Sequence, residues 1–277
     1  DYSEDLRIDK TILTQHAESY RKIRNTFRFI LGNIKDNFVK QSIDSINIKN
    51  FDELEQYILH KLFILSASVK ENLKDYNFHR LYKELLNFCA LDLSSFYFDI
   101  RKDVLYCDSI NSKKRKNCIV VLNIILDCLL KWFAPVLVFT TDEIYSLVSK
   151  DKNNKSIHEY SFPEIPKKFE NVILNEKWKQ LFKIKQEANI AIEEKRASKE
   201  IGSSLEAELE ITTNGKNFEL LEGLDLAEYF ITSKAEKFKS KNKEELKIKV
   251  KKTLGTKCPR CWKILNSKCM RCEKAIL

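Results

Sequence analysis

Glycine and proline are scarce in this sequence, which has 5 glycines and 4 prolines among 277 residues. These residues are the main breakers of helical pattern, so their scarcity favours long helices with few tight turns. Hydrophobic residues make up 43% and charged residues 32% of the chain, which excludes a disordered or collagen-like protein. The length of the chain predicts about two domains.

A signal peptide and a membrane-spanning apolar run are also missing. The sequence opens with Asp1, Glu4 and Asp5 instead of a basic segment followed by an apolar one. In the most apolar stretch, residues 118–139, polar residues recur at four-residue steps, which indicates a buried amphipathic helix. We expect a cytoplasmic protein that makes no membrane contact. We also expect a monomer with no obligate protein partner.

Catalytic motifs are not recognisable either. The sequence has no glycine-rich phosphate loop and no other nucleotide-binding motif. Its four histidines are far apart and near no cysteine pair, which favours helix-surface or packing roles over catalysis. Carboxylates are plentiful but form no pairing more specific than a surface face. The chain is therefore predicted to bind a partner and to contain no catalytic residue.

Helical spacing of apolar residues dominates the first part of the chain. Each helix with one apolar stripe needs a packing partner, so these helices should form a bundle. The second and fifth helices begin with residue patterns typical of capping boxes, at Asn50 with Glu53 and at Thr140 with Glu143. The expected helices span residues 6–31 with Gly32 as the cap, 50 onward, 77–98, 111–133 and 140 onward.

The pattern changes in the second part of the chain. A linker is predicted at residues 150–168, followed by a long helix from Asn175 to just before Gly202. At residues 205–211 the apolar period changes from 3.6 to 2, which indicates a half-buried strand. The other expected elements are a turn at 214–215, a short helix at 218–224, strands at 229–232 and 246–250, and a solvated lysine-rich loop or edge at 234–247. Together they predict a small α+β domain.

Two C-x-x-C pairs, separated by seven residues, stand near the C-terminus. One such turn places two thiolates on one side of a zinc ion, and a second turn completes the tetrahedron. Disulfides are the alternative, but nothing else marks a secreted chain. Four protein thiolates leave no open position, so one structural Zn2+ is predicted. The predicted ligands are Cys258, Cys261, Cys269 and Cys272.

The net charge of +9 suits a nucleic-acid binder, although a compositional bias toward lysine would give the same excess. The placement of the basic residues along the chain is more informative than the net charge. One face of the first expected helix carries three guanidinium groups and an amide, which can pair with phosphates and base edges. A solvated face is the alternative, but it would more often use lysine and glutamate. The four residues are Arg21, Arg24, Asn25 and Arg28.

The cysteine pairs form a second basic feature. Cations flank them, and Trp262 places a large aromatic side chain among these cations. RNA is read largely through splayed bases that stack on aromatic rings or guanidinium planes. Arg260, Trp262 and Arg271 are therefore predicted to bind RNA. Packing of Trp262 over the metal site is the alternative.

Six segments in a fixed order carry a family resemblance that covers nearly the whole chain. They are DYSEDLRI at 1–8, YRKIRNTFRF at 20–29, FYFDIRKDVLY at 96–106, APVLVFTTDEI at 134–144, RASKEIGSSL at 196–205 and CPRCW at 258–262. These segments resemble the C-terminal portion of bacterial-type isoleucyl-tRNA synthetases, which are class I enzymes of the isoleucyl, valyl and leucyl subgroup.

The resemblance implies a mainly α fold in three parts. These are an anticodon-binding helical bundle at 1–165, an α+β junction domain at 166–252 and a zinc-binding peptide at 253–277. It also implies that the basic residues named above hold the anticodon stem-loop of isoleucine tRNA.

In this family the catalytic domain precedes the position of Asp1 and uses ATP to attach isoleucine to tRNA, so the chain alone is expected to be inactive. The alternative function is a zinc-stabilised helical scaffold that binds protein partners or polyanions without specificity.

Overall fold

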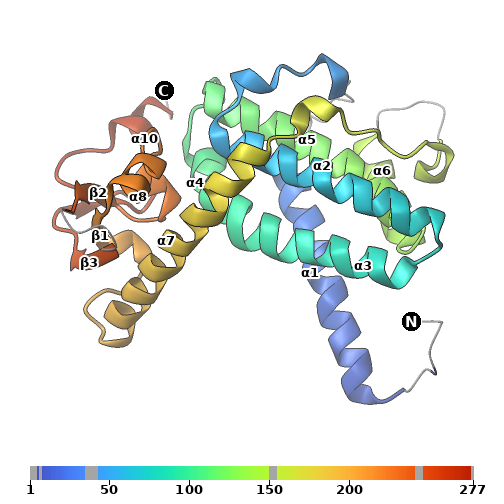
Figure 1. The fold of residues 1–277 in the computed structure, drawn as a ribbon, viewed down its shortest axis with the longest axis horizontal. Helices are drawn as coiled ribbons and strands as arrows, with labels where there is room; N and C mark the ends of the chain where they lie inside the picture. Colours follow the sequence, from blue (N-terminus) through green and yellow to red (C-terminus); the bar gives the residue numbers. More distant parts are fainter. Residues whose placement is uncertain (1–4, 6–7, 35–42, 150–154, 241–245, 276–277) are drawn as a thin grey trace. The chain divides into compact units, whose positions relative to one another are not determined.

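The protein is mainly helical, with a small sheet and a cysteine cluster near its C-terminus, which confirms the predicted fold class (Figure 1). Within the residues described here, no helix is long and apolar enough to cross a membrane. The computed structural model describes residues 5, 8–34, 43–149, 155–240 and 246–275.

Contacts divide the chain into two compact units. The first comprises residues 1–99 and 113–170, and the second comprises residues 100–112 and 171–277. Helix α4 (Asp99–Cys107) lies between helices of the first unit in the sequence, but nearly all of it belongs with the second unit. The three-part division at 165/166 and 252/253 stays a prediction.

The first unit is a helical bundle with an aromatic core. Phe27 meets Phe133 edge to face, with ring centroids 6.1 Å apart, and Phe29 stacks on Phe98 at 4.2 Å. Such pairs add to the stabilisation that burial of apolar area provides. Its helices are α1 (Lys10–Ile34), α2 (Glu53–Lys74), α3 (Phe78–Asn87), the π-helix Phe88–Phe98, α5 (Lys113–Phe133) and α6 (Val138–Val148), with 3-10 turns at Ile43–Ser45, Ile48–Asn50, Ile157–Glu159 and Lys167–Phe169.

The N-terminal half of α1 extends away from the neighbouring helices of this unit (Figure 1). None of the residues from Lys10 to Lys22 is buried, whereas Ile23, Phe27 and Ile30 are fully inside the core. The second half of α1 is therefore anchored by packing, and it holds the first half in solvent.

Several predicted helix ends in this unit are wrong. Asn50 lies in a 3-10 turn, and α2 begins at Glu53 after Asp52, whose side chain makes no capping hydrogen bond. Helix α6 begins at Val138, so Thr140 is inside it. Gly32 is also an interior residue of α1 without a positive φ. The predicted start of the first helix, at residue 6, lies outside the described residues.

The second unit packs α7 (Val172–Ala197) against a three-stranded sheet. In the strand order β2-β1-β3, β1 is parallel to β2 and antiparallel to β3. The core side includes Trp178 of α7 and the alternate residues Leu209 and Ile211 of β1. The other elements are the 3-10 turn Ser204–Glu206, β1 (Ala207–Thr213), α8 (Gly215–Leu220), α9 (Leu226–Tyr229), β2 (Lys234–Lys239), β3 (Leu246–Lys252), β4 (Thr256–Lys257), β5 (Ile264–Leu265) and α10 (Met270–Lys274).

Two expectations for this unit are wrong. Residues 229–232 do not form a strand, because Tyr229 ends α9; the strand is β2, inside the lysine-rich run. Asn214 does not start a turn between strands but caps α8, its side chain accepting a hydrogen bond from the backbone N–H of Asn217 at 2.9 Å. The strand expected at 205–211 is confirmed: it is β1, which begins and ends two residues later, at Ala207–Thr213.

Candidate metal centre and nucleic-acid interface

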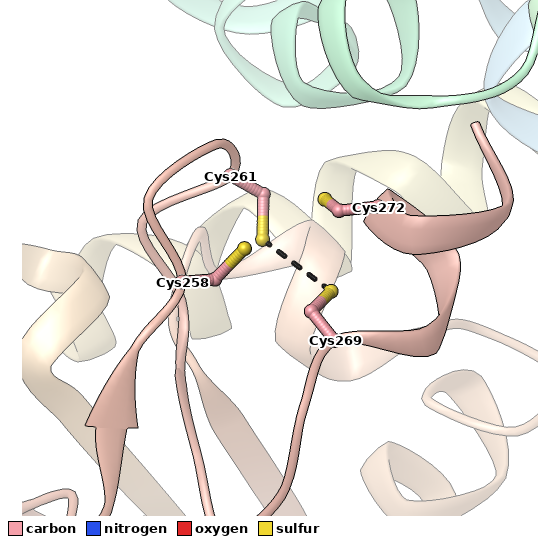
Figure 2. A group of neighbouring side chains, drawn as sticks. All are labelled: Cys258, Cys261, Cys269 and Cys272. Carbon is pink, nitrogen blue, oxygen red and sulfur yellow. Dashed lines mark hydrogen bonds between the residues drawn. The ribbon is translucent and has the colours of Figure 1, made fainter. Parts of the chain in front are cut away.

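Four cysteine side chains converge near the C-terminal end of the second unit (Figure 2). Their sulfur atoms all lie within 4.8 Å of one another, and the Sγ atoms of Cys261 and Cys269 are 3.8 Å apart. Three of the four side chains are buried, and Cys269 is half-buried. All eight cysteines are free, so none of the described residues forms a disulfide. We call residues 256–274 the knuckle.

Local backbone geometry brings the first cysteine pair together. The backbone N–H of Cys258 donates to Lys263 and that of Trp262 donates to Cys258, which closes a tight turn between β4 and β5. Trp262 has a φ of 65°, in the left-handed region. Gly255 precedes β4 with a φ of 132°, and a Cβ there would lie 2.4 Å from the carbonyl oxygen of Leu265. This position therefore requires glycine.

The four thiol groups fit a zinc ion. With Zn–S bonds of about 2.3 Å, the sulfurs of a tetrahedral site are about 3.8 Å apart, which matches the Cys261–Cys269 separation. Burial would raise the pKa of the Cys258 thiol, but hydrogen bonds from the backbone N–H groups of Cys261 and Arg260 outweigh burial and lower it to about 7. One ligand is thus readily deprotonated at neutral pH, as thiolate coordination requires.

The two arginines of the knuckle make hydrogen bonds within the second unit. The guanidinium of Arg271 donates to both carboxylate oxygens of Asp103, at 2.6 and 2.8 Å. The guanidinium of Arg260 donates to the backbone carbonyls of Cys107 and Tyr106, at 2.7 and 3.1 Å. Both groups therefore contact α4 or the residues at its end. Their predicted contact with RNA stays a prediction.

Trp262 is in a different position from these arginines. Its side chain is 59% exposed, and the Lys257 ammonium lies 5.8 Å from the centre of its ring. More than half of the side-chain surface is therefore open to solvent, and packing over the metal site stays the alternative. An exposed aromatic ring beside a cation can stack on an unpaired base.

The basic face of α1 lies in the first unit, and its four predicted residues are all exposed. Arg21 pairs with Glu18 at 2.6 Å on the surface, a contact that contributes little to stability. Arg24 and Arg28 have no ion-pair partner among the described residues. Their charges are available to a polyanion without the loss of an existing ion pair.

The sequence prediction omitted an exposed aromatic residue at the start of α6. The Tyr20 hydroxyl of α1 is 3.0 Å from that of Thr140 in α6, which brings the start of α6 to the side of α1. Phe139, next to Thr140, is 89% exposed. Hydrophobic periodicity alone could not identify Phe139 as exposed, because it predicts that an apolar residue at the start of an amphipathic helix is buried.

Comparison with known proteins gives consistent matches along the chain. The family model described as the anticodon-binding domain of tRNA ligase matches residues 55–211. The isoleucine–tRNA ligase of Pelagibacter ubique is 56% identical over 273 residues, which are 99% of this chain and 30% of that protein. Those of Caldanaerobacter subterraneus and Agrobacterium fabrum are 37% and 36% identical, over 95% of this chain and 29% and 28% of those proteins. The chain spans about 30% of the length of these relatives.

Proposed function

The chain belongs to the anticodon-binding domain family of tRNA ligases, and we propose that it is the tRNA-recognition part of an isoleucine–tRNA ligase. The resemblance of the six sequence segments predicted this family. In the proposed function, the chain holds the anticodon stem-loop of isoleucine tRNA. Residues of the ligase outside this chain bind ATP and attach isoleucine to the tRNA, and the chain alone does not catalyse. We further propose that it acts in the cytoplasm as a monomer.

The basic face of α1 is the observation that carries the proposal. Arg24, Asn25 and Arg28 stand exposed on a helix whose opposite side is buried in the bundle. A rigid helix that presents exposed guanidinium groups can bind RNA phosphates, and these contacts dominate affinity. Phe139 of α6 is also exposed, and we include its ring in the proposed interface as a surface on which a base can stack.

The knuckle is the second part of the proposed interface. One structural zinc ion, held by Cys258, Cys261, Cys269 and Cys272, would fix the turn that carries Trp262. The indole of Trp262 would then cover an anticodon base, and Arg260 and Arg271 would supply positive charge next to it. Zinc contributes no reaction step, because four thiolates leave no open position on the metal.

Removal of the α1 charges tests the proposed RNA contact. We expect the double variant Arg24→Ala, Arg28→Ala to bind isoleucine tRNA severalfold more weakly than the unmodified chain. The slope of log affinity against log salt should decrease by about 1 for each lost phosphate contact. Circular dichroism should show an intact bundle, because both side chains are exposed.

A matched control is Arg80→Ala on α3, which also removes one exposed guanidinium from the first unit but breaks an ion pair with Glu84. It should leave tRNA affinity nearly unchanged. Equal affinity for the unmodified chain and the α1 double variant would remove α1 from the interface. Weak affinity of the unmodified chain for every polyanion would favour the scaffold alternative.

The zinc assignment has its own test. Native mass spectrometry of the purified chain should give the mass of the protein with one bound zinc ion. A metal-free mass that is lower by four hydrogens would indicate two disulfides and would contradict the assignment.

A further inference from the structure

The end of α4 is joined to the knuckle by two guanidinium groups. Arg271 binds the Asp103 carboxylate through two nearly parallel hydrogen bonds and lies 3.4 Å from an oxygen of Asp108. The side chains of these three residues are 35%, 23% and 13% exposed. A two-point pair of this kind fixes direction as well as distance, which a single ammonium contact does not.

Arg260 binds the same helix end in another way. Its guanidinium donates to the carbonyl oxygens of Tyr106 and Cys107, which belong to the last turn of α4. The Cys107 thiol in turn lies 3.7 Å from the carbonyl oxygen of Arg260. Cys107 is 5% exposed and packs in one cluster with Cys258, Cys261 and Cys272.

Helix α4 is itself fixed within the second unit. Arg101 pairs with Glu228 of α9 at 2.7 Å, and their side chains are only 3% and 10% exposed. Separating the two partners of a buried ion pair leaves a buried charge without its counter-charge, which is strongly unfavourable. The Arg101–Glu228 pair therefore holds α4 in place against α9. The knuckle therefore docks on an element that the α+β part of this unit already positions.

We propose that Arg260 and Arg271 are positioning residues that lock the knuckle onto α4 through Asp103 and the α4 carbonyls, and so set the orientation of Trp262. This proposal rests on the proposed function, because the orientation matters for RNA only if Trp262 stacks on a base. Zinc fixes the internal shape of the knuckle, whereas the arginines fix its place on the unit. The guanidinium donors that make these four hydrogen bonds point to α4.

The variant Asp103→Asn separates positioning from direct RNA contact. If Arg271 positions the knuckle, loss of the carboxylate should weaken binding of isoleucine tRNA about fivefold, although no cation is removed. If Arg271 contacts RNA directly, the same change should leave affinity unchanged or raise it, because a negative charge near a polyanion is lost. The two interpretations thus predict different results. If Trp262→Ala weakens tRNA binding but Asp103→Asn leaves it unchanged or tighter, the positioning role is overturned.

A second readout does not depend on RNA. Amide hydrogen exchange in peptides covering residues 256–274 should become about tenfold faster in Asp103→Asn, because the docked state is less populated. Native mass spectrometry should still show one zinc ion. Exchange at the unmodified rate would overturn the lock. Arg271→Lys should give the same acceleration while keeping the charge, and it serves as the test variant if Asp103→Asn loses zinc.

Two control variants distinguish failure of the positioning proposal from failure of the proposed RNA contact. Glu176→Gln removes an exposed carboxylate paired with Lys179 on α7, and should change neither readout. Trp262→Ala should weaken tRNA binding with normal exchange outside its own turn. Faster exchange in Asp103→Asn together with no effect of Trp262→Ala would support the lock and overturn the proposed RNA contact of the knuckle.

Discussion

Gly255 offers a sharp test of the knuckle geometry. Its φ of 132° lies in a region that other residues rarely adopt, and an added Cβ would lie 2.4 Å from the carbonyl oxygen of Leu265 and 2.7 Å from its carbonyl carbon. Both atoms belong to the backbone of β5, so no side chain can rotate away to make room. The variant Gly255→Ala must therefore shift the strand that leads to the first cysteine pair.

The expected cost follows from this geometry. A non-glycine residue in such a backbone region costs about 1 to 3 kcal/mol. If this strain is relieved when the metal-free knuckle opens, it appears as weaker zinc binding. At 1.4 kcal/mol for each factor of ten, zinc affinity should fall about fivefold to 150-fold.

Competition with a chromophoric chelator measures this change directly. Gly32→Ala and Gly223→Ala are the controls, since a Cβ at either position meets nothing within 4 Å. Neither control should alter zinc affinity. Gly32→Ala, inside α1, should also stabilise the fold by about 0.5 to 1 kcal/mol. Unchanged zinc affinity in Gly255→Ala would refute the reasoning from the φ angle and the close approach.

Three further outcomes are expected. Trp262→Ala should weaken binding of isoleucine tRNA by about 1 to 3 kcal/mol, measured by titration, because one base loses its stacking partner. Phe139→Ala should weaken it in the same assay without lowering the melting temperature, since the ring is 89% exposed. Burial raises the pKa of Asp103, but the hydrogen bonds and charge of Arg271 outweigh burial and hold it below the usual range of an aspartate. The stabilisation by this pair is therefore complete above the ordinary pKa and is lost as pH falls through the lowered one. As pH falls below the ordinary pKa of an aspartate, the melting temperature should fall less in Asp103→Asn than in the unmodified chain.

Helix positions were predictable because helical periodicity is a local signal that repeats over several turns. The helix expected at 111–133 is α5 at Lys113–Phe133, and the one expected at 77–98 is α3 at Phe78–Asn87 continued by the π-helix Phe88–Phe98. Caps were not predictable from four residues. The pattern at Asn50 and Glu53 is present, but the chain forms a 3-10 turn there and α2 begins at Glu53.

The misplaced strand has a different cause. The buried rings of Tyr229 and Phe230 pack against one another, and Tyr229 also packs against Trp178. Tertiary packing therefore places these residues, and they form no strand. The true strand β2 is an edge strand with little burial, and its lysine-rich sequence carries only a weak alternation. Edge strands often carry lysine, which hides them from a search for apolar residues.

In the candidate site, too, local features were predictable from the sequence and contacts between distant residues were not. The four cysteines were found because their ligand spacing is short and local. The partners of Arg271 and Arg260 on α4 lie 168 and 153 residues earlier in the chain, and no spacing rule connects them. The sequence therefore predicted which side chains are charged, but not which of them make hydrogen bonds to other parts of the chain.

The central claim is that this chain recognises isoleucine tRNA, and a binding titration tests it most directly. The chain, with its zinc content verified, is titrated with an isoleucine tRNA transcript and an unrelated transcript at low and higher salt. The account predicts a preference for the isoleucine transcript that persists at the higher salt, because base contacts are less sensitive to salt than phosphate contacts. Equal binding of both transcripts that collapses with salt would contradict it.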